Sequence, residues 1–198
     1  MAATMMDVPI PLRPGRNIRK AARGFTLVEL LVTTGIAAVL SMVAIPAMTG
    51  MLDAQRRISS VNHFVSSLHL ARGEAIKRGG RAVVCKSADG SECTVGGHWE
   101  QGWIVFHDAN NNALLDPDEW VVRRQGALGD RFRLSGNQPV ANYVSYGATG
   151  SAKMVSGAFQ AGTFTLCAAN GRNEDVRTII LSGTGRPRTA RGTASDCR

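Results

Sequence analysis

Two patterns of apolar and polar residues divide the chain into an N-terminal helical part and a C-terminal part built of short strands. From Phe25 to Met48 the chain is apolar, and Glu29 is its only charged residue. About 22 residues at ~1.5 Å rise cover roughly 33 Å, enough to cross a bilayer core of ~30 Å. The pattern therefore predicts a transmembrane helix over residues 25–47.

The helix is expected to continue past the membrane in amphipathic form, to about residue 78. Apolar residues recur there at spacings of three and four, which indicates one buried face. Pro46 and Gly50 are expected to bend or loosen the helix without ending it, and Gly79 with Gly80 to stop it. The recurring residues are Ile58, Val61, Phe64, Val65, Leu68, Ala71 and Ala75.

After residue 80 the pattern changes to short β-type runs separated by glycine, asparagine and serine, as turns require. One long helix backed by antiparallel strands is an α+β fold. The domain over residues 48–198 is therefore expected to be α+β, with the second half of the helix packed on an antiparallel sheet. The expected strands are Arg81–Lys86, Gly102–His107, Trp120–Arg124, Phe132–Leu134, Tyr143–Tyr146, Thr163–Ala168 and Arg177–Leu181.

Charge orients the chain. The formal net charge is +8, and residues 1–24 supply +4 of it, so the apolar segment follows a basic flank. By the positive-inside tendency we expect a single-pass membrane protein whose N-terminus stays cytoplasmic and whose remaining chain is exported. The apolar run is longer than the ~7–15 residues of a secretory signal and has no clear A-x-A site.

Glu29 is unusual in this setting, because a carboxylate inside a membrane helix costs ~2.5–3.5 kcal/mol and normally has a partner. Cleavage after Gly24 would leave Phe25 with a free ammonium group. Glu29 of a neighbouring copy is expected to pair with that ammonium.

At these residues the chain resembles the type IV prepilin family, through the run Arg23-Gly24-Phe25-Thr26-Leu27-Val28-Glu29-Leu30. The resemblance implies that a prepilin peptidase removes residues 1–24 as a leader, cutting between Gly24 and Phe25, and that Phe25 is then N-methylated. It also implies that Glu29 guides assembly with other pilin subunits. The exported domain is then expected in the periplasm and the anchor in the inner membrane, before assembly into a pilus or pseudopilus. Pro46 matches a helix-kinking proline common in such pilins.

The spread of strands is similar to the GspH/FimT branch of pilin-like proteins. The matching features are the helix end at Arg72–Lys77, the run Gly102–Phe106 before an Asx-rich turn, and Gly185-Arg186 after the last expected strand. The resemblance implies one of two functions. FimT-like members are minor pilins of type IV pili, some of which bind DNA in natural transformation, whereas GspH-like members are minor pseudopilins of type II secretion that act through protein contacts.

The C-terminal segment is basic and is expected to form an exposed loop. Guanidinium groups separated by small residues can fork onto phosphates, and Gly185-Arg186-Pro187-Arg188 is similar to the GRxR motif of FimT-type pilins. The segment holds no aromatic residue, which favours contacts to the DNA backbone without base stacking. The alternatives are a solvated tail, or arginines that pair with Glu174 and Asp175. The candidate DNA-binding residues are Arg186, Arg188, Arg191 and Arg198.

A second candidate site lies between two expected strands. Oxygen-bearing residues stand at positions 1, 3, 5, 9 and 12 of a loop, as in a calcium-binding EF-hand, but Ala113 occupies the position that needs glycine. Asx-rich segments also form tight turns through their own side chains, so a hairpin turn is the favoured alternative. The calcium candidates are Asp108, Asn110, Asn112, Asp116 and Glu119.

The four cysteines form no C-x-x-C pair, and an even count downstream of a membrane segment fits disulfides in an oxidising compartment. Three pairings exist, of which sequence proximity favours Cys85–Cys93 with Cys167–Cys197. A zinc cluster of Cys85, Cys93, His98 and His107 has a spacing that fits no common site. No phosphate loop or nucleophile motif occurs, so we expect neither an enzyme nor a cofactor.

Overall fold

The computed structural model describes residues 24–171 and 175–197, except for the side chains of Pro46 and Ala47. The chain divides into two compact units, Met1–Met48 and Thr49–Arg198. The first unit contains the start of helix α1, where the apolar side chains are exposed. The helix is long and apolar enough to cross a membrane. The second unit contains the rest of α1 and all the strands.

Helix α1 runs from Leu27 to Arg78. The Thr26 hydroxyl accepts a hydrogen bond from the Glu29 N–H at 3.2 Å, which satisfies one of the free backbone donors at the helix start. Gly79, with a φ of +63°, ends the helix in a conformation that glycine adopts without strain. The expected helix over about 26–78 is confirmed, and both Pro46 and Gly50 lie inside it.

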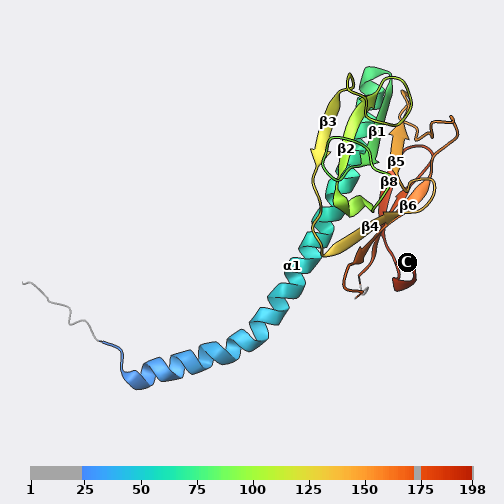
Figure 1. Cartoon of the computed structure of the whole chain (residues 1–198). Coiled ribbons are helices and arrows are strands. Elements are labelled where there is room, and N and C mark those ends of the chain that lie inside the picture. Colours follow the sequence, from blue (N-terminus) through green and yellow to red (C-terminus); the bar gives the residue numbers. More distant parts are fainter. Residues whose placement is uncertain (1–23, 172–174, 198) are drawn as a thin grey trace, which may run out of the picture. The chain divides into compact units, whose positions relative to one another are not determined.

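The first sheet is antiparallel, in the order β3-β2-β1-β5. Side chains of β1 are buried on both faces, because one face packs on α1 and the other is covered by loops. Figure 1 shows β1 and β2 lying along the C-terminal part of α1. The strands are β1 Arg81–Lys86, β2 Trp103–Asp108, β3 Val121–Gln125 and β5 Tyr143–Tyr146, and the 3-10 helix η1, Trp99–Gln101, precedes β2.

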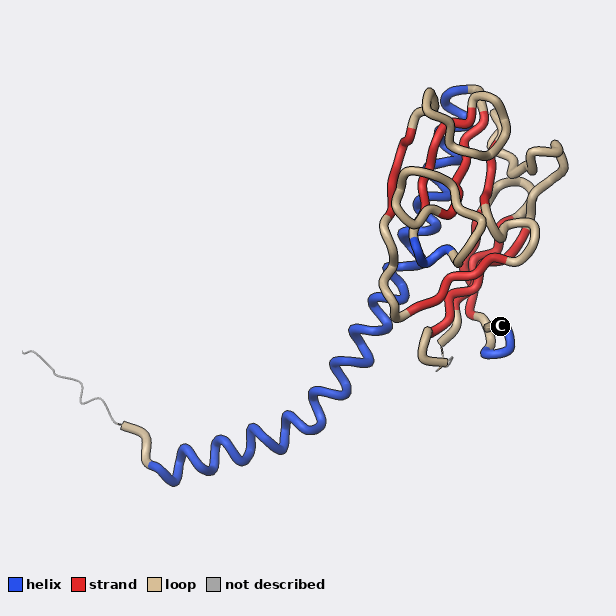
Figure 2. The backbone as a smooth tube through the Cα atoms, in the orientation of Figure 1, coloured by secondary structure: helices blue, strands red, loops and turns tan. Residues whose placement is uncertain are grey.

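The second sheet is also antiparallel, in the order β4-β6-β7-β8. Its inner face contributes Phe132, Leu134, Phe164, Leu166 and Ile179 to the core that it shares with the first sheet. Figure 2 shows the two groups of strands as separate layers. The strands are β4 Phe132–Gly136, β6 Gly162–Ala168, β7 Arg177–Leu181 and β8 Pro187–Arg191, and the 3-10 helix η2, Ala194–Asp196, follows.

Phe64 of α1 is the centre of the core. Its ring lies 5.1 Å from the ring of Trp99, 5.0 Å from Trp103 and 4.7 Å from Phe164, all in edge-to-face contact. Aromatic pairs prefer this arrangement because the positive ring edge meets the negative ring face. One fully buried side chain thus joins the helix to both sheets.

Two sequence expectations are corrected. The expected basic C-terminal loop contains a strand, β8, which begins at proline and pairs with β7 as the last strand of its sheet. A strand at the edge of a sheet tolerates a proline at its start, because its outer side makes no backbone hydrogen bonds to another strand. The residues of β8 are not buried, so Pro187–Arg191 lacks the alternation of apolar residues by which a strand is recognised in the sequence. Trp120, expected to begin the strand Trp120–Arg124, instead precedes β3 and is 66% exposed.

Candidate functional site

The residues expected to direct processing and assembly lie at the start of the described chain. Gly24 and Phe25 precede α1, and the Phe25 side chain is 84% exposed. Glu29 is exposed in the first turn of α1, where a negative charge is favourable to the helix dipole. Pro46 lies within α1, but its side chain is outside the described residues.

The strands β7 and β8 form a hairpin that carries three of the four candidate arginines. Ile180 pairs with Arg188, and Arg177 pairs with Arg191. The turn is closed by a hydrogen bond from the Gly185 N–H to the Ser182 carbonyl at 2.8 Å. The Ser182 and Arg186 backbones then continue the pairing, since the Ser182 N–H donates to the Arg186 carbonyl at 3.3 Å.

Gly185 fixes this turn against the rest of the domain. Its φ of +78° is strained for other residues. A Cβ atom at this position would collide with the Gly150 carbonyl oxygen and lie 3.0 Å from the Tyr146 ring. The hairpin is therefore seated on the segment that follows β5, and this contact holds the first residue after the turn, Arg186, in place.

The hairpin separates the arginines onto two faces. Paired and alternating residues of a sheet share a face, so Arg186 and Arg188 extend to the outer face of the second sheet and Arg191 to its inner side. All three are exposed. Within residues 24–171 and 175–197, none of the three has an ion-pair partner. The fourth candidate, Arg198, lies outside the described residues.

One alternative to DNA binding is that these arginines pair with Glu174 and Asp175. Glu174 lies outside the described residues. Asp175 pairs with Arg57 at 2.8 Å and with Arg177 at 3.2 Å. Burial raises the pKa of Asp175, but the hydrogen bonds and charges of Arg57 and Arg177 outweigh it and hold the pKa below its ordinary value.

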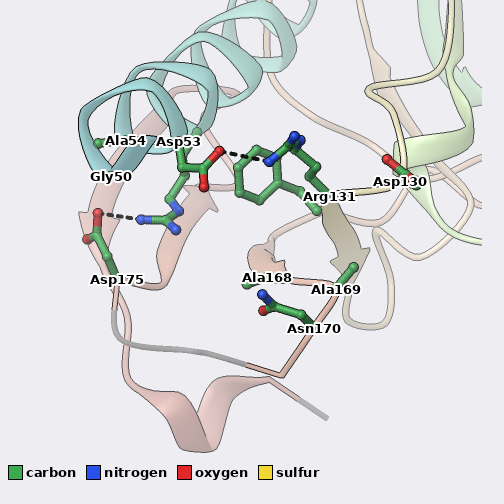
Figure 3. A pocket seen from close by; sticks show the side chains of 11 residues that line it. Gly50, Asp53, Ala54, Asp130, Arg131, Ala168, Ala169, Asn170 and Asp175 are labelled. Atoms are coloured by element: carbon green, nitrogen blue, oxygen red, sulfur yellow. Dashed lines mark hydrogen bonds and ion pairs between the residues drawn. The ribbon is translucent and has the colours of Figure 1, made fainter. Parts of the chain in front are cut away.

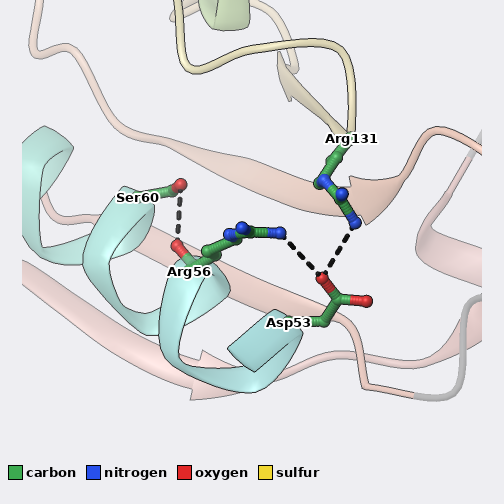
Figure 4. Close-up of polar contacts among 4 residues, drawn as sticks. All are labelled: Asp53, Arg56, Ser60 and Arg131. Carbon is green, nitrogen blue, oxygen red and sulfur yellow. Dashed lines mark hydrogen bonds and ion pairs between the residues drawn. The ribbon is translucent and has the colours of Figure 1, made fainter. Parts of the chain in front are cut away.

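A cleft of about 610 Å³ lies beside α1 and is lined by charged side chains (Figure 3). Asp53 accepts hydrogen bonds from Arg131 at 3.1 Å and from Arg56 at 3.4 Å, as Figure 4 shows. Arg57 binds Asp175 on the other side. Because most of these charges neutralise one another, the cleft offers a ligand few free charged groups.

The calcium candidates form a loop that is closed by its own hydrogen bonds. Buried Asp108 accepts the N–H of Asn112 at 3.1 Å and that of Ala113 at 3.0 Å. Asp116 accepts the side-chain amides of Asn110 and Asn112, both at 2.8 Å. Glu119 accepts the backbone N–H groups of Ala109 and Asp116. These bonds are the ones an Asx-rich hairpin turn makes.

The cysteines form the two bridges that sequence proximity favours. Cys85 is bonded to Cys93, with 5.6 Å between Cα atoms, and Cys167 to Cys197, with 5.9 Å. The first bridge excludes the zinc cluster, because neither sulfur remains a thiolate. Across the described part of the chain, no group of three or more His, Cys, Asp or Glu side chains is placed to hold a metal ion.

The comparisons with known proteins cover most of the chain. Residues 60–185 match the family model of the type II transport protein GspH, and residues 19–45 match the prokaryotic N-terminal methylation motif. No curated protein matches.

Two solved structures resemble this chain. The type IV minor pilin FimU of Pseudomonas aeruginosa is 16% identical with a TM-score of 0.51, over 72% of this chain and 92% of that one. The minor pseudopilin EpsH of the Vibrio cholerae type 2 secretion system is 13% identical with a TM-score of 0.47, over 69% and 97%. Because the GspH family model spans more than half of its length, this chain belongs to the GspH family of pilin-like subunits, the minor pilins and pseudopilins of type IV pili and type II secretion.

Proposed function

We propose that this GspH-family subunit is a minor pilin that binds DNA without sequence preference, for uptake in natural transformation. One observation carries the proposal. Arg186, Arg188 and Arg191 are exposed on one short hairpin and have no ion-pair partner among the described residues. A guanidinium group without a protein partner is free to bind phosphate in the bidentate geometry that it favours.

The surroundings of the hairpin support an anionic ligand. Between Asp175 and Asp196 the chain contains no aspartate or glutamate, and none occurs between Asp130 and Glu174. The segment on which Gly185 is seated therefore adds no negative charge near the arginines. Nearby acids would otherwise repel the phosphates and offset the attraction.

The separation of faces sets the expected salt dependence. Arg186 and Arg188 lie on one face and can contact consecutive phosphates of a single strand, whereas Arg191 contributes from the other side of the edge strand. Two phosphates on duplex DNA give a slope of log K against log salt of about −2, and a third gives about −3. A slope near zero contradicts the proposal.

The proposal includes the route by which the subunit reaches a filament. A prepilin peptidase cuts between Gly24 and Phe25, Phe25 is N-methylated, and the segment 25–47 anchors the subunit in the inner membrane with the domain in the periplasm. The match to the methylation motif supports this route. Glu29 then pairs with the Phe25 ammonium of another pilin subunit, and Pro46 loosens the helix for packing.

A gel-shift titration of the processed full chain in neutral detergent micelles tests DNA binding. The variant Arg186→Gln/Arg188→Gln is expected to bind a duplex about tenfold or more weakly. The matched control is Arg123→Gln/Arg124→Gln, which removes the same amount of charge from β3. Strand β3 is the edge of the first sheet that lies opposite to β5, whereas the hairpin contacts the segment that follows β5. Equal loss in both double variants would indicate net charge alone and overturn the hairpin site.

The second candidate is a minor pseudopilin of type II secretion that acts through protein contacts. The match to the type II transport protein GspH over residues 60–185 favours it. If the hairpin variant shifts DNA as the unmodified chain does, this second function is the one that remains.

A further inference from the structure

Phe159 is an aromatic side chain with no place in the core. It lies between β5 and β6 and is 72% exposed, whereas the other phenylalanines of the strand region, Phe106, Phe132 and Phe164, are buried. Its ring lies beside Gly183 in the β7–β8 turn, since a Cβ atom on Gly183 would be 3.6 Å from the ring carbon Cδ1. An exposed ring thus lies next to the turn of the basic hairpin.

Two cationic residues lie near the ring in the fold. Lys153 pairs with Phe159 in an antiparallel bridge, which places the two side chains on the same side, within about 5.5 Å at Cβ. Arg186 follows Gly183 by three residues, so the Cα atoms of these two residues are at most about 11 Å apart. Within the described part of the chain neither cation has an ion-pair partner, and no acid lies between residues 131 and 173.

This arrangement changes the expectation drawn from the C-terminal segment alone. No aromatic residue occurs in that segment, which favoured contacts to phosphates only. The fold brings an aromatic residue, Phe159, next to the hairpin from a different part of the sequence. An aromatic ring bordered by cations is the arrangement by which single-stranded nucleic acid is held, the base stacking on the ring and the phosphates lying on the cations.

We propose that Phe159 stacks on an unpaired base of single-stranded DNA whose phosphates lie on Lys153, Arg186 and Arg188. The inference rests on the proposed function and names its substrate class, because a base inside a duplex presents no free face to the ring. Single-stranded DNA therefore gains a contact that duplex DNA lacks.

The test compares a labelled oligothymidine with a hairpin duplex of the same length, titrated with the processed full chain in neutral detergent micelles. Phe159→Leu keeps an apolar side chain but removes the ring. It is expected to weaken binding to oligothymidine about tenfold and to leave duplex binding within about twofold. Phe159→Tyr keeps a ring and is expected to retain the affinity.

Salt dependence separates stacking from charge. Stacking releases no counterions, so Phe159→Leu is expected to lower the affinity for oligothymidine without changing the salt slope. Arg186→Gln/Arg188→Gln removes two phosphate contacts and is expected to flatten that slope by about 1.4. The matched aromatic control is Trp120→Leu, since Trp120 is similarly exposed but adjoins β3. It is expected to bind as the unmodified chain does.

Each outcome decides between the two proposals. If Phe159→Leu binds oligothymidine as tightly as the unmodified chain while the arginine variant loses affinity, stacking is overturned and DNA binding stands. A loss in Phe159→Leu that is equal for oligothymidine and duplex also overturns stacking. If the arginine variant binds both DNAs normally, both proposals fail. Reduced incorporation of Phe159→Leu into filaments with normal DNA binding assigns the ring to a subunit contact and overturns stacking too.

Discussion

Arg57 on α1 and Asp175, just before β7, form an ion pair of 2.8 Å between residues 118 positions apart in the sequence. The Arg57 guanidinium also lies over the ring of Phe132, 5.5 Å from its centre. The pair and the ring contact tie the helix to β4 and to the segment just before β7. Both contacts are made by a residue that precedes Phe64 on α1, and so they hold the helix on the N-terminal side of the aromatic core.

Replacing Arg57 by Gln is expected to lower the stability of the domain by about 1–2 kcal/mol, because both the ion pair and the cation–π contact are lost. Thermal unfolding of the processed chain in detergent measures the effect. The control is Arg56→Gln, whose more exposed contact with Asp53 spans 3.4 Å; it is expected to cost less than about 0.5 kcal/mol. Equal losses would show that Arg57 adds no more than a surface charge.

The same pair predicts a pH dependence. Arg57 and Arg177 hold the pKa of Asp175 below its ordinary value, so the folded state favours the ionised carboxylate. The stabilisation is therefore complete above the unfolded pKa of about 4 and is lost as the pH falls through the depressed pKa. The difference in melting temperature between the unmodified chain and Asp175→Asn is expected to be constant from about pH 7 to 5 and to shrink below about pH 4. A difference that grows on acidification would contradict this assignment.

Gly185→Ala is expected to destabilise the domain by at least about 2 kcal/mol, because the positive φ is strained for alanine and its Cβ collides with the Gly150 carbonyl. Gly157→Ala is the matched control. Gly157 has a similar φ of +86°, but no atom lies within 4 Å of the place that a Cβ would occupy, so only backbone strain of about 1–2 kcal/mol is expected. Melting temperatures compare the two, and a smaller loss for Gly185→Ala than for Gly157→Ala would refute the packing role.

Most of the fold could be predicted from the sequence. Helix α1 and seven strands follow from apolar periodicity and from glycines at turns, because burial selects these patterns directly. Strand β8 could not be predicted in this way. Its residues bury little, and it forms because the turn at Gly185 returns the chain along β7.

The candidate site was predictable only in part. The residue types of the basic hairpin indicate phosphate contacts. The face of the sheet on which each arginine lies depends on the register of β8, and no register could be assigned to a segment that was expected to be a loop. Arg191 is thus separated from Arg186 and Arg188. Phe159 could not be assigned to this surface, because only the tertiary contact with Gly183 brings it there.

Asp108→Ala is expected to cost about 1–3 kcal/mol, because the Ala113 N–H, which donates to buried Asp108, would be left without a partner. The Asn112 N–H would lose one of its two acceptors and keep the Asn110 side-chain oxygen. Asp118→Ala, at an exposed position in the same loop, is the control and is expected to change the stability by less than about 0.5 kcal/mol. Chelation of calcium is expected to leave the melting temperature of the unmodified chain unchanged. A lowered melting temperature on chelation would favour the calcium site over the hairpin turn.

Glu29→Gln tests the assembly role without disturbing the helix start. Glutamine can replace glutamate in the first turn of a capped helix, and the hydrogen bond from the residue 29 N–H to Thr26 does not involve the side chain. The substitution removes the charge that would pair with the Phe25 ammonium of a neighbour. We expect incorporation into filaments to fall on the order of a hundredfold, since an unpaired ammonium inside the membrane costs ~2.5–3.5 kcal/mol and each ~1.4 kcal/mol is a factor of ten.

Loss of pairing is separated from loss of processing by two measurements on the same Glu29→Gln sample. Quantitative mass spectrometry of sheared filaments measures incorporation, and the N-terminal peptide reports cleavage before Phe25, which is expected to be unchanged. Glu29→Asp keeps the charge on a shorter side chain, so it is expected to recover part of the incorporation. Normal incorporation of Glu29→Gln would remove the pairing from the assembly mechanism, because the ammonium would then need no carboxylate from a neighbouring subunit.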